Sequence, residues 1–345
     1  MPIRMGFCSS HAPSLFFNTY EGWERMHHRL NDGHPQPPET ELENEEEIAR
    51  RMPKIRQAFA TLKDELTKFR PDVVVAVIGD QREMFDGSNI PNIGVYTGGD
   101  TWTVHNTGLM DEDPMPSPYD EKFRYPVKVD QDLAKKILNG LVRDGFDAAI
   151  IEQMDAQSQP DRGVPHGWGN PAIHILPDMG IPMVLVLVNV DDGPPAILNG
   201  KRCLELGRAI ARICEDSPKR IAIYGSGGMS HDPRGPRSGW VDEPLDHWFL
   251  EQLESGTAQN LEAMFSFRSE NFVGGTGELR CWTVVAGAVD EVKPGHKATT
   301  VDYIPARKVT TGAGWAYWPP SKTPPPSPRA SRQPAQRNAL EGPVD

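Results

Sequence analysis

The stretch IAIYGSGGMSHDPRG, residues 221–235, is the segment from which the fold of this chain can be deduced. Its apolar start predicts a buried strand, and three of the four residues that follow IAIY are glycine. Glycines directly after a buried strand let the backbone turn sharply and approach a ligand closely. His231 then falls near the carboxyl end of the strand, where α/β proteins collect their chemistry. The alternative is a tight turn in which His231 and Asp232 only hydrogen-bond the loop, and this stretch alone leaves both interpretations open.

Buried strands and amphipathic helices alternate along the rest of the chain. DVVVAVI at residues 72–78 is too apolar for a half-exposed strand. Residues 45–69 carry apolar side chains at three- and four-residue steps, which indicates an amphipathic helix. This alternation predicts the α/β class, with helices on both faces of the sheet. We expect further strands at 3–9, 93–96, 146–154 and 182–190, and helices at 130–145, 199–216, 242–255, 260–268 and 279–288, with a short helix starting within 171–176.

The remaining segments are polar. Residues 18–45 are rich in charge and proline and are expected to form a lid or surface excursion. They hold His27, His28 and His34, and the paired histidines His27 and His28 are expected to face solvent. Residues 319–345 are rich in Pro, Ser and Arg and predict a disordered tail. Because no internal repeat or linker is evident, we expect one catalytic domain over residues 1–318.

Composition excludes several function classes. The chain has 36 basic and 48 acidic residues, a net charge of −12, which argues against a nucleic-acid or anionic-membrane surface. Its four cysteines are far apart without CxxC spacing, so neither structural zinc nor a disulfide framework is indicated. The N-terminus lacks the apolar core of a signal peptide, and no apolar run approaches the roughly 20 residues of a membrane span. We expect a cytoplasmic protein.

Polar side chains follow or flank core elements at several separate places. They are His11 after the first strand, the loop 80–83, His231, and Glu278 beside a glycine-rich turn. Imidazole, amide and carboxylate groups on one face suit a divalent metal with open positions, as in non-haem Fe(II) sites. Each group also has a structural interpretation, since Glu278 could complement a helix dipole and Gln81 could act as a hydrogen-bonding bracket. A hydrolytic triad at residues 230–232 is disfavoured, because adjacent residues do not easily align as nucleophile, base and orienting group.

Several motifs together resemble the class III extradiol ring-cleavage dioxygenase family, in particular catalytic β subunits of the protocatechuate 4,5-dioxygenase type. The resemblance implies a three-layer α/β/α fold around a central, mostly buried mixed sheet. It implies Fe(II) bound by His11, Glu278 and the residue at position 81, with His231 as the acid/base residue. The motifs are SSHAP at 9–13, the strand and loop at 73–85, IIEQMD at 150–155, GKRCLELG at 200–207, GSGGMSHDPRGPRSG at 225–239, GTGELRCW at 275–282 and DYIPARKVTTGAG at 302–314.

The chain departs from the family pattern at two places. A histidine is expected at position 81, where the chain has Gln81, and Glu83 two residues on is an alternative ligand. An Asp-His-Gly triplet is expected after the 150–155 segment, where the chain has Arg162 in place of the histidine. Arg162 could pair with a substrate carboxylate, and His166 could bind substrate or replace the missing imidazole.

The predicted activity is therefore iron-dependent opening of a catecholic or hydroxylated (hetero)aromatic acid, with both atoms of O2 incorporated. Apart from substrate and O2, the expected partners are further copies of the chain, with or without a small α-type subunit. The alternative hypothesis is a catalytically altered family member that serves as a binding or partner subunit, because Gln81 replaces a metal-ligand histidine.

Overall fold

The computed structural model describes residues 3–104, 124–154, 163–176, 179–190 and 198–320. Its strands are β1 (Ile3–Ser9), β2 (Val73–Gly79), β3 (Ile93–Tyr96), β4 (Thr101–Val104), β5 (Arg124–Val127), β6 (Ala148–Ile151), β7 (Met183–Val188), β8 (Ile221–Ser226), β9 (Thr299–Ala306) and β10 (Thr311–Trp318). Its helices are α1 (Tyr20–Asn31), α2 (Glu45–Phe69), α3 (Gln131–Arg143), α4 (His166–Ile175), α5 (Gly200–Ile213), α6 (Glu243–Ser255) and α7 (Leu279–Val292).

A mixed eight-stranded sheet forms the centre of the molecule, in the order β6-β3-β7-β2-β8-β1-β10-β9. The four strands β7, β2, β8 and β1 are parallel neighbours. On one side of them, β10 and β9 form an antiparallel hairpin; on the other, β3 pairs antiparallel with β7. The carboxyl ends of β1, β2 and β8 therefore lie together at one edge of the sheet.

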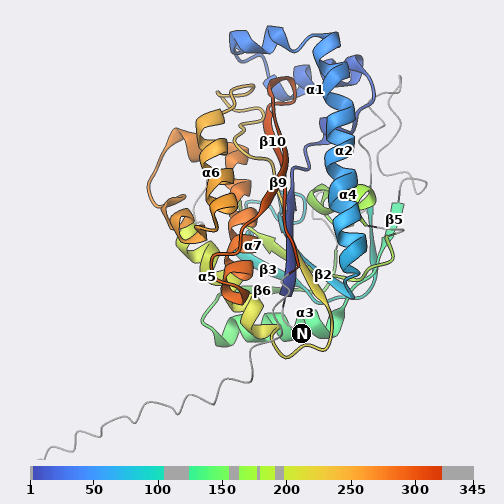
Figure 1. Ribbon diagram of the computed structural model, residues 1–345, viewed down its shortest axis with the longest axis vertical. Coiled ribbons are helices and arrows are strands. Elements are labelled where there is room, and N and C mark those ends of the chain that lie inside the picture. The colour runs from blue at the N-terminus through green and yellow to red at the C-terminus, as the bar shows by residue number, and fades with distance from the viewer. Residues whose placement is uncertain (1–2, 105–123, 155–162, 177–178, 191–197, 321–345) are drawn as a thin grey trace, which may run out of the picture.

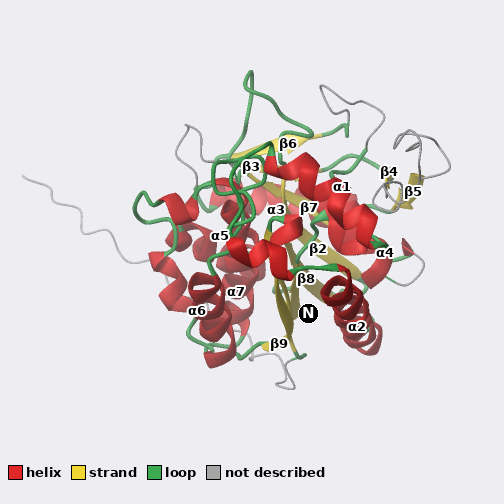
Figure 2. Ribbon diagram, turned by 90° about the horizontal axis from the view of Figure 1, so that it is seen from above, coloured by secondary structure: helices red, strands yellow, loops and turns green. Residues whose placement is uncertain are grey.

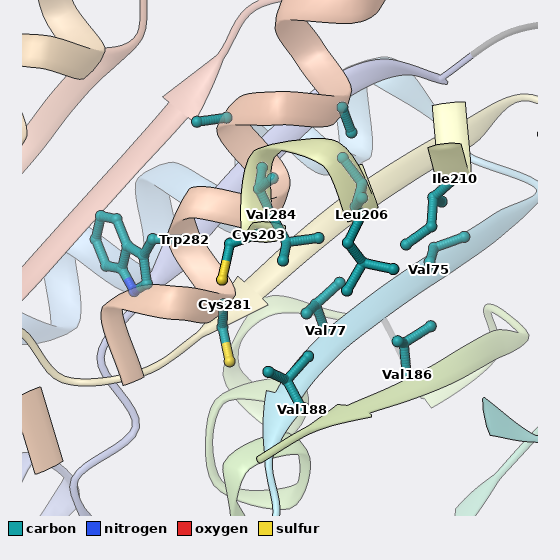
Figure 3. Close-up of a cluster of buried hydrophobic side chains, with 14 of the residues drawn as sticks. Val75, Val77, Val186, Val188, Cys203, Leu206, Ile210, Cys281, Trp282 and Val284 are labelled. Carbon is teal, nitrogen blue, oxygen red and sulfur yellow. The ribbon is translucent and has the colours of Figure 1, made fainter. Parts of the chain in front are cut away.

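Helices cover both faces of the sheet, so the fold is a three-layer α/β/α arrangement (Figures 1 and 2). Alternate residues of β2 point to opposite faces, and all are buried. Val75 and Val77 face the layer of α3, α5, α6 and α7, and Figure 3 shows them packed with Val186 beneath α5 and α7. The intervening residues face α1, α2 and α4. Burial on both sides explains why the strand reads as an unbroken apolar run.

The predicted elements are largely confirmed, and two helices need correction. The expected helix at 45–69 matches α2, and its end at Phe69 follows from Arg70 adopting a left-handed conformation before Pro71. The short helix expected to begin at Pro171 begins at His166 instead; Pro171 has no N–H for the carbonyl of Gly167, and that carbonyl accepts a hydrogen bond from Ser226. The helix expected at 260–268 is a 3₁₀ segment, Ala258–Ala263, followed by turns.

The segment 18–45 contains a helix that is tied to the body of the protein. Helix α1 buries Trp23 and Met26 in the core on the α2 face. His28 is exposed, as expected, but the expectation for His27 is wrong: it is buried, and its Nδ1 lies 3.0 Å from the carbonyl oxygen of Lys308. Burial lowers the pKa of His27, which favours its neutral form. The lid role and the single domain stay predictions, and the predicted tail lies almost wholly outside the described residues.

In the part of the chain that the structure describes, no helix combines the length and apolar character needed to cross a membrane.

Candidate active site

Three neighbouring parallel strands deliver three of the predicted site residues to one edge of the sheet. Strands β2, β8 and β1 are adjacent in that order. β1 leads to His11, β2 to Gln81 and β8 to His231. Glu278 ends the 3₁₀ turn Gly274–Glu278 and begins α7, which packs on β1 and β8. The fold thus joins four side chains that are far apart in the sequence.

Glu278 lies at the centre of this group, and each of its carboxylate oxygens faces predicted site residues. Oε1 lies 3.5 Å from His11 Nε2 and accepts a 2.6 Å hydrogen bond from Gln81 Nε2. His11 Nε2 and Gln81 Nε2 are 3.5 Å apart, so the three groups form a small triangle. Oε2 lies 3.6 Å from His231 Nε2. His11, Gln81 and His231 therefore surround the buried carboxylate of Glu278.

The environment of Glu278 favours its charged form. Burial alone would raise the pKa of the carboxyl, but positive charge on His11 and His231 and a hydrogen bond from the backbone N–H of Gly228 outweigh burial and lower the pKa to about 2. The backbone of Gly227 approaches closely as well, since a Cβ atom there would lie 2.6 Å from the Cβ of Glu278. The glycines of the sequence motif thus allow the loop to contact the carboxylate directly.

His11 is held in the tautomer that leaves Nε2 unprotonated. Its Nδ1 lies 2.9 Å from Ser226 Oγ, and the hydroxyl of Ser226 donates to the carbonyl oxygen of Gly167. Because the hydroxyl has one proton and uses it on that carbonyl, Oγ accepts from Nδ1–H of His11. In the neutral ring Nε2 then carries the lone pair, whereas a proton on Nε2 would make an ion pair with Oε1 of Glu278. Sequence reasoning missed Ser226, although a polar residue closing an apolar strand opposite Ser9 was a usable signal.

His231 is fixed in the same tautomer by backbone contacts. Its Nδ1 lies 2.7 Å from the carbonyl oxygen of Met229, which can only accept a hydrogen bond, so Nδ1 carries the proton. The backbone N–H of His231 donates to Thr276 Oγ1, and its carbonyl accepts from the N–H of Thr276. His231 Nε2 is left with a lone pair, as a general base requires. Thr276, also missed in the sequence, ties the His231 loop to the turn that carries Glu278.

Gln81 projects into the site from a strained turn. Gln81 and Arg82 have φ values of 45° and 58°, and Glu83 N–H donates to Asp80 O at 3.0 Å, as in a type I′ turn. Left-handed conformations at non-glycine residues cost about 1–2 kcal/mol each and cluster at functional sites. The carboxylate of Asp80 stabilises the turn by accepting from the N–H groups of Met84 and Phe85.

Glu83 is turned away from Glu278 and toward His166. One carboxylate oxygen accepts from the backbone N–H of His166 at 3.0 Å, and the other contacts His166 Nδ1. The His166 ring lies perpendicular to the His11 ring, with centroids 4.9 Å apart. Glu83 is therefore placed to orient His166, not to join the triangle around Glu278. Arg162 lies outside the described residues, so its contact with substrate stays a prediction.

The donor set fits a divalent cation. When both imidazoles are neutral, their Nε2 atoms turn lone pairs toward one carboxylate, and a cation between them would stabilise this arrangement. The Oε1 atom of Gln81 is buried and lacks a hydrogen-bond partner within the described residues. Rotation of this amide by half a turn would offer an oxygen to a cation and would relieve the orphaned acceptor. Within those residues no group of three or more His, Cys, Asp and Glu side chains has metal-binding spacing, which is consistent with an amide at position 81.

Residues 6–312 match the family model described as the catalytic LigB subunit of aromatic ring-opening dioxygenase, and the chain belongs to this family. One relative, a 2,3-dihydroxyphenylpropionate/2,3-dihydroxicinnamic acid 1,2-dioxygenase of Mycobacterium sp. (strain MCS), is 31% identical over 53% of this chain and 50% of its own length. Gallate dioxygenase of Pseudomonas putida is 29% identical over 46% of this chain and 45% of its own. The match thus spans about half the length of these curated relatives.

Among solved structures, an uncharacterized protein from Escherichia coli K12 aligns with a TM-score of 0.49 and 15% sequence identity, covering 91% of this chain and 99% of the other.

Proposed function

We propose that this protein is an Fe(II)-dependent extradiol dioxygenase that opens the ring of a catecholic or hydroxylated heteroaromatic acid. In the reaction a carbon–carbon bond next to the two hydroxyl-bearing carbons breaks, and both atoms of O2 enter the product. The observation that carries the proposal is the arrangement of His11, His231 and Gln81 around the buried carboxylate of Glu278. Family membership and the names of the relatives support it.

His11 and Glu278 would hold the metal, and Gln81 lies at the third corner of the same triangle. Ser226 keeps the lone pair of His11 Nε2 directed at the site, and Gly228 keeps Glu278 charged and in place. When Fe(II) is bound, the adjacent oxygens of the substrate are stabilised as anions and oriented against dioxygen.

His231 would move the protons. Its Nε2 lone pair accepts a proton from a substrate hydroxyl, while Nδ1–H stays bonded to the carbonyl of Met229. Glu278 Oε2, 3.6 Å away, stabilises the imidazolium that results. The imidazolium then returns the proton as the ring opens, which restores the neutral base.

The test is O2 uptake by the protein reconstituted anaerobically with Fe(II) and offered a panel of catechols that includes 2,3-dihydroxyphenylpropionate and gallate. We expect one O2 consumed per ring opened. His231→Ala should keep its iron and lose about 10²–10⁴-fold in turnover, the usual range for general acid–base catalysis. His28→Ala is the matched control, because His28 is exposed on α1.

Full turnover in His231→Ala would contradict the acid/base role. Iron bound by the wild-type protein without O2 uptake on any catechol would contradict the enzyme and favour the alternative, a binding or partner subunit altered at Gln81.

A further inference from the structure

A second buried carboxylate, that of Asp246, lies behind the His231 loop and takes no part in the proposed proton transfers. Asp246 belongs to the first turn of α6 and is fully buried. Its Oδ1 accepts a 2.8 Å hydrogen bond from the backbone N–H of Ser230. Its Oδ2 accepts from the hydroxyl of Ser230 at 2.9 Å and from the hydroxyl of Tyr303, on β9, at 2.7 Å. The carboxylate therefore joins α6 and β9 to the residue before His231.

The peptide unit between Met229 and Ser230 connects this carboxylate to the His231 ring. The N–H of that unit donates to Asp246, and its C=O accepts from His231 Nδ1 at 2.7 Å. Because a trans peptide is planar, its N–H and C=O point in opposite directions, and fixing one fixes the other. Hydrogen bonds in series also strengthen each other. Asp246 thus orients the carbonyl that sets the tautomer of His231.

Strand β10 holds the same peptide from the other side. The N–H of Met229 donates to the carbonyl of Gly312 at 2.8 Å, and the N–H of Gly312 donates to the carbonyl of Ser230 at 2.9 Å. A Cβ atom at Gly312 would lie 2.1 Å from Asp246 Oδ2, so the strand packs directly on the carboxylate. The peptide of residues 229–230 is therefore clamped between Asp246 and β10.

This arrangement is costly for the folded protein. Among the described residues, no Lys, Arg or His forms an ion pair with Asp246. Burial accordingly raises the pKa of Asp246 to about 7, although its three hydrogen bonds lower it. A neutral side chain at this position would avoid the cost of burying a charge. A carboxylate here instead supplies acceptors for three donors at once.

We propose that Asp246 is a positioning residue for His231, acting through the peptide between Met229 and Ser230, and that Tyr303 holds the carboxylate in place for this task. The inference rests on the acid/base role of His231 in the proposed function. It assigns the direction of His231 Nε2 to a buried cluster on α6 and β9, outside the group around Glu278.

Turnover at pH 8, with Asp246 ionised, is the first test. Asp246→Ala should lower kcat about 100-fold at unchanged KM, as a displacement of about 1 Å at a catalytic group does, and Tyr303→Phe should lower it about tenfold. In the His231→Ala background neither change should have a further effect, because both act through the imidazole. Tyr96→Phe is the matched control: its hydroxyl bonds the carbonyl of Gly99, and β7 and β2 separate its strand from β8. Equal fold-losses in the two backgrounds would overturn the inference.

Nitrogen-15 NMR of the histidine rings in the metal-free protein gives a readout that needs no turnover. The His231 signals are identified by their absence from His231→Ala. We expect the Nδ1–H tautomer in wild type and in Tyr96→Phe, and a mixture of tautomers in Asp246→Ala and Tyr303→Phe. If Asp246→Ala does not fold, Tyr303→Phe decides. An unchanged tautomer in the folded variants would overturn the inference even if catechols are opened. The expected change of tautomer, in a protein whose wild type opens no catechol, would support the positioning role and contradict the proposed function alone.

Discussion

Two walls of the candidate site are built on different principles. The β8 wall consists of residues 226–231 and 275–278, and its members are held by backbone contacts from several elements. The β2 wall consists of residues 80–83 with His166, and its site-facing groups are held by side-chain contacts from a turn with two left-handed residues. Of the two departures from the expected family pattern, the one that lies within the described residues, Gln81, belongs to the β2 wall.

This difference shows where a site can change its chemistry. In the β8 wall, glycines leave no room for a side chain, since a Cβ atom on Gly275 would lie 2.0 Å from His231 Nε2. The glycines there are needed because the backbone lies too close to neighbouring atoms to admit a Cβ atom. In the β2 wall the contacts join the ends of side chains, so backbone space restricts the residue types there less.

The largest expected effect comes from filling space in the β8 wall. Gly275→Ala should lower turnover by at least about 100-fold, because His231 is locked by the Met229 carbonyl and the added methyl group must displace either the ring or the turn that carries Glu278. It should also lower the free energy of unfolding by about 1–3 kcal/mol, the usual cost of overpacking. Turnover and urea unfolding measure the two effects.

Gly87→Ala is the matched control, since a Cβ atom at Gly87 has no atom within 4 Å. Its turnover and stability should equal those of wild type. If Gly275→Ala has the turnover and stability of this control, the close approach of Gly275 to His231 does not restrict position 275 to glycine.

Much of the fold followed from the sequence, because strands buried on both faces appear as apolar runs and α2 shows its helical period directly. The antiparallel hairpin β9–β10 was not predicted, since TGAGWAYW mixes small residues with aromatic ones and has neither a clear alternation nor an unbroken apolar run. Burial of His27 was missed for a related reason, as its partner Lys308 comes from a distant part of the chain.

The meeting of His11, Gln81, His231 and Glu278 was predicted by resemblance and not by spacing. The sequence could not show in which direction the side chains of the loop after β2 point. Glu83 was an alternative ligand two residues from Gln81, but the type I′ turn points their side chains to different partners. Turn type depends on φ angles that non-glycine residues rarely adopt, so the residue types did not reveal it.

The smallest expected effect concerns the support of the β8 wall. Asp246 is buried and accepts hydrogen bonds from the N–H and hydroxyl of Ser230, next to His231, and from the hydroxyl of Tyr303. Burial raises the pKa of Asp246 from 3.8 to about 7, despite these hydrogen bonds. Between about pH 4 and 7 the folded protein therefore keeps a proton on this carboxyl that the unfolded chain has released. The contribution of Asp246 to the free energy of unfolding is greatest below about pH 4 and falls as the pH rises to about 7. The side chain of the Asp246→Asn variant cannot titrate. The free energy of unfolding of this variant should therefore fall less steeply between pH 5 and 7 than that of wild type. The difference between the two slopes corresponds to at most one proton bound on folding. Urea unfolding at both pH values measures this, and equal slopes would mean that Asp246 stays charged beneath the β8 wall.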